Sequence, residues 1–214
     1  MTKLIAEVGS VHDGSFGNAL KLIDLAKECG ADSVKFQTHI ASEETLETAP
    51  QPSFFKSEER YAYFERTGFS KSQWKLLVEK CDSIGIEFIS SPFSIKALNL
   101  LEELKVKIYK IPSGEVTNLP LLEAVSKTGK PILLSSGMST WNELDSAVKT
   151  ITKYNKNLTL LQCTTEYPCK YENVGINVML EMKERYGFPI GLSDHTLTNY
   201  ASFLAVSLGA TVIE

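Results

Sequence analysis

Eight stretches of the chain share one pattern, in which a run of apolar residues ends on small or polar residues. The stretches recur at intervals of roughly 25–40 residues, a spacing that suits one strand plus one helix. They cover residues 4–10, 33–38, 86–92, 108–115, 131–137, 158–164, 189–195 and 210–214. We therefore predict eight short β-strands.

Amphipathic helices are predicted between these strands. In residues 18–29 the apolar positions fall at 19, 22, 23, 26 and 29, which is the stripe of a helix that lies on a sheet, and Gly30 is placed to end it. Side chains that can cap a helix indicate where others begin. Further helices are predicted to start at Ser70, Ser94, Asn118 and Thr140 and to cover 173–186 and 198–208.

Strands that alternate with helices through short connections are typical of a parallel sheet, and eight such units predict a closed (β/α)8 barrel. The alternative is an open doubly wound sheet. No Gly-x-Gly-x-x-Gly follows the first strand, so a dinucleotide-binding fold has little support. Residues 1–214 end at Glu214, on the last predicted strand, so we expect this barrel domain to lack its eighth helix.

One connection is much longer than the others. Residues 40–69 are rich in Glu, Ser, Pro and aromatic residues. A connection of this length inside a domain is often a functional lid or rim, and the alternative is a solvated excursion with a small aromatic cluster. The pattern favours neither interpretation. The aromatic residues concerned are Phe54, Phe55, Tyr61, Tyr63 and Phe64.

Composition narrows the class of protein. The 214 residues are 43% hydrophobic and 22% charged with a net charge of −4, so there is no basic excess of the kind that binds nucleic acid. The amino terminus lacks the features of a signal peptide, and no apolar run approaches the roughly 20 residues that span a bilayer. We predict a cytoplasmic protein without nucleic-acid or membrane partners.

The cysteines do not form a recognisable pattern. Cys29, Cys81, Cys163 and Cys169 are scattered without a Cys-x-x-Cys pair. We predict reduced and mostly buried thiols.

Residues that can do chemistry gather at the predicted carboxyl ends of the strands, where a barrel places its active site. They include lysines, hydroxyl groups, carboxylates and histidines. The set comprises His12, Asp13, Lys35, Gln37, Ser90, Ser91, Lys110, Ser113, Glu115, Ser135, Ser136, Thr164, Thr165, Tyr167, Ser193, Asp194 and His195.

Two of these residues are lysines inside predicted strands. Burying a lysine without an anion is costly, so Lys35 and Lys110 together favour a doubly or triply charged ligand. Serine hydroxyls at the strand ends suit phosphate oxygens. A salt bridge within the barrel is the alternative for each lysine alone. His195 could be a metal ligand, a general acid or base, or a packed histidine.

Seven segments, in order along the whole chain, resemble motifs of the sialic acid synthase family, which includes N-acetylneuraminate, legionaminate and pseudaminate synthases. The segments are EVGSVHDG (7–14), VKFQT (34–38), SPF (91–93), YKIPSGE (109–115), LSSGM (134–138), CTTEYP (163–168) and GLSDHT (191–196).

The resemblance implies a transferase of polysaccharide biosynthesis that forms a C–C bond between phosphoenolpyruvate and an open-chain N-acetylmannosamine-type sugar, with Mn²⁺ or Mg²⁺. It implies catalytic roles for Asp13 and Glu115, sugar contacts from Gln37, Thr165 and Tyr167, and His195 as a metal ligand. It implies phosphoenolpyruvate contacts from Lys35, Ser91, Lys110, Ser113, Ser135 and Ser193.

The chain departs from the family pattern at Val11, where Asn is frequent, at Asp13, where Glu or Asn is common, and at Thr165, which can be Asn. The family continues beyond the last strand to a second metal-binding histidine, the eighth helix and a carboxy-terminal antifreeze-like domain. We therefore expect residues 1–214 to be part of a longer, homodimeric protein and to show little or no activity alone.

Two other functions fit the same barrel. The first is another phosphoenolpyruvate-dependent synthase that makes an octulosonate or heptulosonate phosphate. It would need a second phosphate pocket, whereas the arginines are few: Arg60, Arg66 and Arg185. The second is a non-catalytic sugar-binding barrel, which would not need the lysines and acids that this chain retains.

Overall fold

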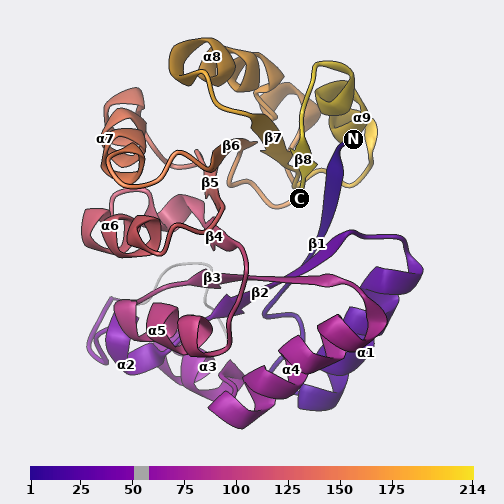
Figure 1. The fold of residues 1–214 in the computed structure, drawn as a ribbon, viewed down its shortest axis with the longest axis vertical. Helices are drawn as coiled ribbons and strands as arrows, with labels where there is room; N and C mark the ends of the chain where they lie inside the picture. The colour runs from indigo at the N-terminus through magenta and orange to yellow at the C-terminus, as the bar shows by residue number, and fades with distance from the viewer. Residues whose placement is uncertain (51–57) are drawn as a thin grey trace. The chain divides into compact units, whose positions relative to one another are not determined.

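The computed structural model describes residues 1–50 and 58–214 (Figure 1). Its eight described strands are parallel and follow one another in sequence order in a closed barrel, which confirms the predicted (β/α)8 fold. The strands are β1 (Lys3–Gly9), β2 (Ser33–Thr38), β3 (Glu87–Pro92), β4 (Tyr109–Ile111), β5 (Ile132–Ser135), β6 (Leu158–Cys163), β7 (Ile190–Ser193) and β8 (Val212–Ile213).

The chain divides into two compact units, which we describe separately. The amino-terminal unit consists of Ala6–Val106, and the carboxy-terminal unit consists of Met1–Ile5 with Lys107–Glu214. The first contains the β2–β3 pair, in which Lys35 lies opposite Ile89 and Gln37 opposite Ser91. The second contains the ladder from β4 to β8 and the start of β1, paired to β8.

Helices of the amino-terminal unit cover the outward face of its strands. Alternate residues of a strand point to opposite faces, so Phe36 points away from Lys35 and Gln37 and toward the helices. The Phe36 ring stacks on Phe88 at 5.5 Å and meets Trp74 edge-on at 6.0 Å. The helices are α1 (Phe16–Glu28), α2 (Ala41–Glu44), α3 (Arg60–Thr67), α4 (Lys71–Ile84) and α5 (Ile95–Glu103), and α1 and α4 lie side by side in Figure 1.

The carboxy-terminal unit alternates strands with four α-helices among its described residues. This unit also contains two single-turn 3₁₀-helices, one shortly after β4 and one in the connection after β6. The α-helices are α6 (Leu119–Lys127), α7 (Trp141–Thr152), α8 (Ile176–Tyr186) and α9 (Tyr200–Ser207), and the 3₁₀-helices are η1 (Ser113–Glu115) and η2 (Tyr171–Asn173).

Capping side chains start four helices at the predicted residues. The side-chain oxygens of Ser70, Ser94, Asn118 and Thr140 each accept a hydrogen bond from a backbone N–H of the first turn. Such bonds satisfy donors that the helix itself leaves unpaired. The sequence therefore predicted these boundaries through local chemistry.

Other boundaries differ from the predictions. The predicted strand at 108–115 ends at Ile111, because Pro112 has no N–H for the ladder and the chain turns into η1. The helix predicted at 173–186 begins only at Ile176, after Gly175 in a left-handed conformation. Helices α2 and α3 were not predicted. Phe54 and Phe55 of the expected aromatic cluster lie outside the described residues.

The cysteines are free thiols, as predicted. Cys81, Cys163 and Cys169 are buried and Cys29 is exposed. Burial raises the pKa of the Cys81 thiol to about 12, which keeps it protonated and unreactive. None of the helices in the described residues has the length and apolar character needed to cross a bilayer.

Gly191 in β7 leaves no room for a side chain. An added Cβ would lie 2.4 Å from the Val212 carbonyl oxygen and 2.6 Å from Leu161 Cδ2. We expect Gly191→Ala to lower the free energy of unfolding by about 1–3 kcal/mol in denaturant titrations. Gly17, in α1, has open space around it, so Gly17→Ala is the matched control and should be neutral or stabilising by about 0.4–1 kcal/mol. Equal effects of the two substitutions would contradict this account.

Candidate active site

Lys110 and Glu214 form a buried ion pair in the carboxy-terminal unit. Lys110 Nζ lies 2.7 Å from Glu214 Oε2, and the two side chains are 4% and 6% exposed. The same oxygen accepts a hydrogen bond of 2.5 Å from Ser193 Oγ, which lies 2.9 Å from Ser135 Oγ. Strands β4, β5 and β7 thus bring three predicted residues together around a carboxylate that was not predicted.

Ser113 lies at the start of η1 with its hydroxyl oxygen buried. This Oγ has no hydrogen-bond partner within the described part of the chain. A Cβ added to Gly137, in the loop after β5, would lie 2.6 Å from it. The glycine therefore allows the backbone to approach the serine, and it leaves a buried hydroxyl that can bind a ligand oxygen.

Glu115 is half-buried at the end of η1. Its Oε2 accepts a hydrogen bond of 2.8 Å from Asn118 Nδ2, while Asn118 Oδ1 caps α6. The helix start therefore orients the predicted catalytic carboxylate.

His195 lies in the loop after β7. Its Nδ1 is 2.7 Å from the Thr164 carbonyl oxygen, which can only accept, so Nδ1 carries a proton and Nε2 is the nitrogen left to meet a ligand. The Tyr167 ring covers the imidazole at 4.1 Å, and Tyr167 and Thr165 are exposed. The neighbouring Asp194 instead accepts hydrogen bonds from the Thr196 amide and the Ser202 hydroxyl.

Lys35 and Glu7 form the corresponding ion pair of the amino-terminal unit. Lys35 Nζ lies 2.8 Å from Glu7 Oε2, and their side chains are 3% and 34% exposed. Gln37 Nε2 donates to Glu7 Oε1 at 3.1 Å. Ser91, opposite Gln37 on β3, is buried, and its hydroxyl oxygen lacks a hydrogen-bond partner among residues 1–50 and 58–214.

Asp13 contacts the long connection rather than the lysine. Its backbone is left-handed, and its carboxylate is 71% exposed and 2.9 Å from Arg66 Nη1. Arg66 also holds both oxygens of Glu58, at 3.0 and 2.8 Å. The hydrogen bond from Arg66 lowers the pKa of Glu58. Arg66 in α3 therefore anchors the connection to the loop after β1.

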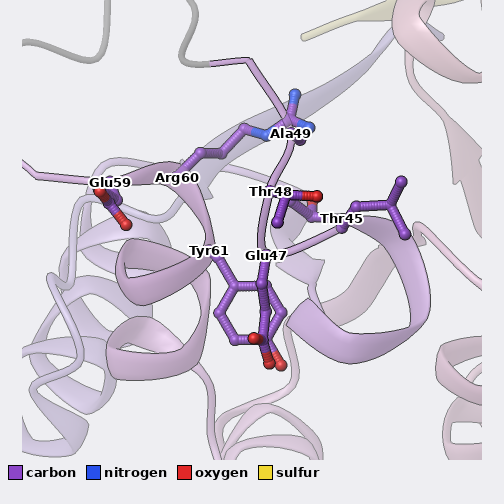
Figure 2. Close-up of a pocket in the computed structure, with 8 residues that line it drawn as sticks. Thr45, Glu47, Thr48, Ala49, Glu59, Arg60 and Tyr61 are labelled. Atoms are coloured by element: carbon purple, nitrogen blue, oxygen red, sulfur yellow. The ribbon is translucent and has the colours of Figure 1, made fainter.

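The long connection also contains a hollow of about 250 Å³ (Figure 2). Its lining carries two carboxylates, one guanidinium group and one phenol, and none of these residues was predicted as part of a site. The lining residues are Thr45, Leu46, Glu47, Thr48, Ala49, Glu59, Arg60 and Tyr61.

Comparison with known proteins identifies the family. The sequence profile of the NeuB family matches residues 22–214. The chain belongs to the NeuB family. This confirms the resemblance to sialic acid synthases.

NeuB-family relatives are similar along the whole chain. N,N′-diacetyllegionaminic acid synthase of Campylobacter jejuni is 38% identical, over 100% of this chain and 66% of its own length. Human N-acetylneuraminate-9-phosphate synthase is 34% identical, over 99% of this chain and 60% of its own length. The uncharacterized protein MJ1065 of Methanocaldococcus jannaschii is 39% identical, over 100% of this chain and 61% of its own length. The chain thus spans less than two thirds of the length of these relatives.

Solved structures show the same fold. The N-acetylneuraminic acid synthetase of Leptospira borgpetersenii, in complex with citrate, superposes with a TM-score of 0.87 at 31% identity, over 100% of this chain and 72% of that one. A truncated 3-deoxy-D-arabino-heptulosonate 7-phosphate synthase of Thermotoga maritima superposes with a TM-score of 0.70 at 17% identity, over 99% of this chain and 73% of that one. The second likeness shows the fold alone.

The divalent cation that the resemblance implies would have one suitable ligand, His195, among the described residues. The tautomer of His195 suits a metal ligand, because Nδ1–H is bound to a carbonyl and Nε2 is left to coordinate. No group of three or more His, Cys, Asp or Glu side chains in the described ranges could hold a metal. His195 therefore fits as one ligand.

Sequence reasoning missed the carboxylates that pair with the lysines. Glu7 and Glu214 lie on predicted strands, and an acid in an otherwise apolar strand was the signal that could have identified them. Arg66 was missed because it contacts Asp13, which lies 53 positions away in the sequence.

The Lys110–Glu214 pair can be tested by a double-mutant cycle. We expect Lys110→Met to lower the free energy of unfolding by about 3–5 kcal/mol, because it leaves Glu214 buried without its counter-charge. Adding Glu214→Gln should recover part of this loss, since it removes the uncompensated charge. A double variant that loses as much as the two single variants combined would show that the pair is not coupled.

His12 provides a test of pH dependence. It is 2% exposed, its Nδ1 accepts a hydrogen bond from the Gly14 amide, and burial lowers its pKa despite the opposing effect of Asp13. The unfolded chain therefore binds the proton more readily, and stability should fall as the pH drops below about 6.5. Unfolding measured from pH 7 to pH 5 should show less of this loss in His12→Gln. An unchanged pH profile would argue against a neutral, buried His12.

Proposed function

We propose that this protein is a nonulosonic acid synthase, which condenses phosphoenolpyruvate with an N-acetylmannosamine-type sugar to give a sialic-acid-like 2-keto acid and phosphate. The observation that carries the proposal is the family match, because relatives at 34–38% identity are named legionaminic, pseudaminic and N-acetylneuraminate-9-phosphate synthases. Activity, substrates and partners are proposed for the whole protein.

The surroundings of the lysines support phosphoenolpyruvate as the anionic substrate. Carboxylates 2.7 and 2.8 Å from the ammonium groups keep Lys110 and Lys35 charged, and charged donors bind phosphate and carboxylate oxygens strongly. Buried serine hydroxyls lie in the same two units. The proposed phosphoenolpyruvate contacts are Lys35, Ser91, Lys110, Ser113, Ser135 and Ser193.

The proposed reaction joins carbon 3 of phosphoenolpyruvate to the aldehyde carbon of the open-chain sugar. Water then adds at carbon 2, and the tetrahedral intermediate expels phosphate as its C–O bond breaks, which leaves the 2-keto acid. Asp13 and Glu115 are the proposed groups for proton transfer at the reacting centre. A divalent cation, Mn²⁺ or Mg²⁺, would polarise the aldehyde when bound, with His195 as one ligand.

The acceptor end of the site is proposed from three residues. Gln37 has an amide that can donate and accept, Thr165 has an exposed hydroxyl, and the exposed Tyr167 is placed beside His195. Such groups suit a polar sugar with an N-acyl substituent. We further propose that the intact protein is a cytoplasmic homodimer without nucleic-acid partners.

The first test is phosphate release from phosphoenolpyruvate by the intact protein with manganese. Parallel reactions would contain N-acetylmannosamine, a diacetamido hexose, arabinose 5-phosphate or no sugar, and parallel controls would omit the metal. We expect release only with metal and an unphosphorylated amino sugar. Release with arabinose 5-phosphate would move the assignment to the octulosonate branch, and release with no sugar at all would contradict the condensation.

The lysines can be tested in the same assay. We expect Lys35→Met and Lys110→Met each to lower kcat/KM for phosphoenolpyruvate by about 10²-fold, because each removes charged hydrogen bonds to the substrate. The matched control is Lys96→Met, since Lys96 forms a surface pair with Glu43 and is 62% exposed. Variants that fold and keep full kcat/KM would contradict the assigned contacts.

A further inference from the structure

His39 follows β2 directly, and its imidazole lies between two phenyl rings. The ring centroids of Phe64 and Phe93 are each 3.9 Å from that of His39, at interplanar angles of 13° and 25°. Phe64 belongs to α3 of the long connection, and Phe93 follows β3. The His39 side chain is 6% exposed. The two rings fix the plane of the imidazole and therefore the directions of both nitrogens.

Both nitrogens of His39 meet acceptor oxygens. Nδ1 lies 2.7 Å from Glu44 Oε1, and Nε2 lies 3.2 Å from Gln37 Oε1. Gln37 Nε2 in turn donates to Glu7 Oε1, and Glu7 pairs with Lys35. A continuous chain of hydrogen bonds thus runs from the long connection to the buried lysine, entirely within the amino-terminal unit.

The direction of each bond follows from what the groups can donate. A carboxylate only accepts, so Gln37 must turn its NH₂ toward Glu7 and its carbonyl oxygen toward His39. That oxygen only accepts, so His39 Nε2 must carry a proton. Glu44 also accepts through Oε1, which requires a second proton on Nδ1 or one shared with the carboxyl group.

Glu44 is buried beside the ring. Its side chain is 8% exposed, and its Oε2 has no hydrogen-bond partner among the described residues. The contact of Oε1 with His39 Nδ1 is therefore a hydrogen bond that holds both side chains in place.

We propose that His39, held by Glu44 and by the rings of Phe64 and Phe93, fixes the orientation of the Gln37 amide, which makes His39 a positioning residue for the sugar acceptor. The proposal rests on the proposed function only in taking Gln37 as a sugar contact. It assigns a role to the described parts of the long connection, because Glu44 on α2 and Phe64 on α3 hold the ring that orients Gln37.

The protonation pattern is tested by ¹⁵N NMR of the histidine rings in the intact protein at pH 7. We expect Nε2 of His39 to be protonated, because it must donate to the Gln37 carbonyl oxygen. His12 is an internal reference with one unprotonated nitrogen, since its Nδ1 accepts from Gly14. Glu44→Gln should shift the Nδ1 signal and leave the proton on Nε2, whereas Glu43→Gln, on the same helix and at the surface, should change neither signal. An unprotonated Nε2 in the unaltered protein would overturn the proposal.

Two substitutions at position 39 separate positioning from packing. His39→Phe keeps an aromatic ring but removes the donor, and His39→Gln keeps an N–H donor but loses the ring. We expect KM for the amino sugar to rise about tenfold in His39→Phe and less in His39→Gln, with little change in KM for phosphoenolpyruvate. A purely packing role predicts the opposite order, and that order would overturn the proposal.

The NMR and kinetic experiments distinguish failure of the role proposed for His39 from failure of the proposed synthase activity. If the intact protein turned over none of the sugars, the proposed synthase activity would fail, while the ring signals would still show whether Nε2 of His39 carries the proton that it donates to Gln37. The Gln37 side-chain amide protons add a readout without substrate: they should exchange faster with solvent in His39→Phe than in the unaltered protein. Equal exchange rates would overturn the positioning role.

Discussion

A lysine ammonium in the interior of a barrel requires a counter-charge, and this requirement shapes both units of the protein. Lys110 pairs with Glu214 and Lys35 with Glu7, and the acids come from strands that were predicted as mostly apolar. Without its carboxylate partner, either buried lysine would lose its proton or destabilise the fold. Paired, each ammonium stays charged and held in one direction before any substrate arrives. That is the condition under which a buried cation can bind an anion without reorganising the protein.

The neutral groups around the pairs extend the same arrangement. Ser193 shares the Glu214 oxygen with Lys110, and Gln37 shares the Glu7 carboxylate with Lys35. The carboxylates therefore orient polar neighbours as well as compensating charge. Ser91 and Ser113 differ, since no described residue satisfies their buried hydroxyls. Groups of this kind are costly in a purely structural interior, which is why they support a ligand site.

The barrel was predictable because its signals are local. Runs of apolar residues ending on polar ones marked the strands, and caps such as Ser70 and Thr140 marked helix starts with their own side chains. Most predicted site residues followed from the rule that such residues gather at strand ends. What the sequence could not show depends on distant partners: Lys110 meets a residue 104 positions away, and Arg66 meets Asp13 across 53 positions. Helices α2 and α3 were missed because neither has a capping side chain, and their stability comes from contacts such as that between Phe64 and His39.

The close approach of Gly137 to Ser113 makes the residue that is tolerated at one position depend on the residue at the other. An added Cβ at 137 would lie 2.6 Å from the hydroxyl oxygen of Ser113, so a side chain at 137 requires the serine to move. Loss of the serine side chain would remove this particular obstacle, and a larger residue at 113 would tighten it. The two positions are therefore expected to vary together among related sequences. A related sequence that keeps serine at 113 is therefore expected to keep glycine at 137 as well.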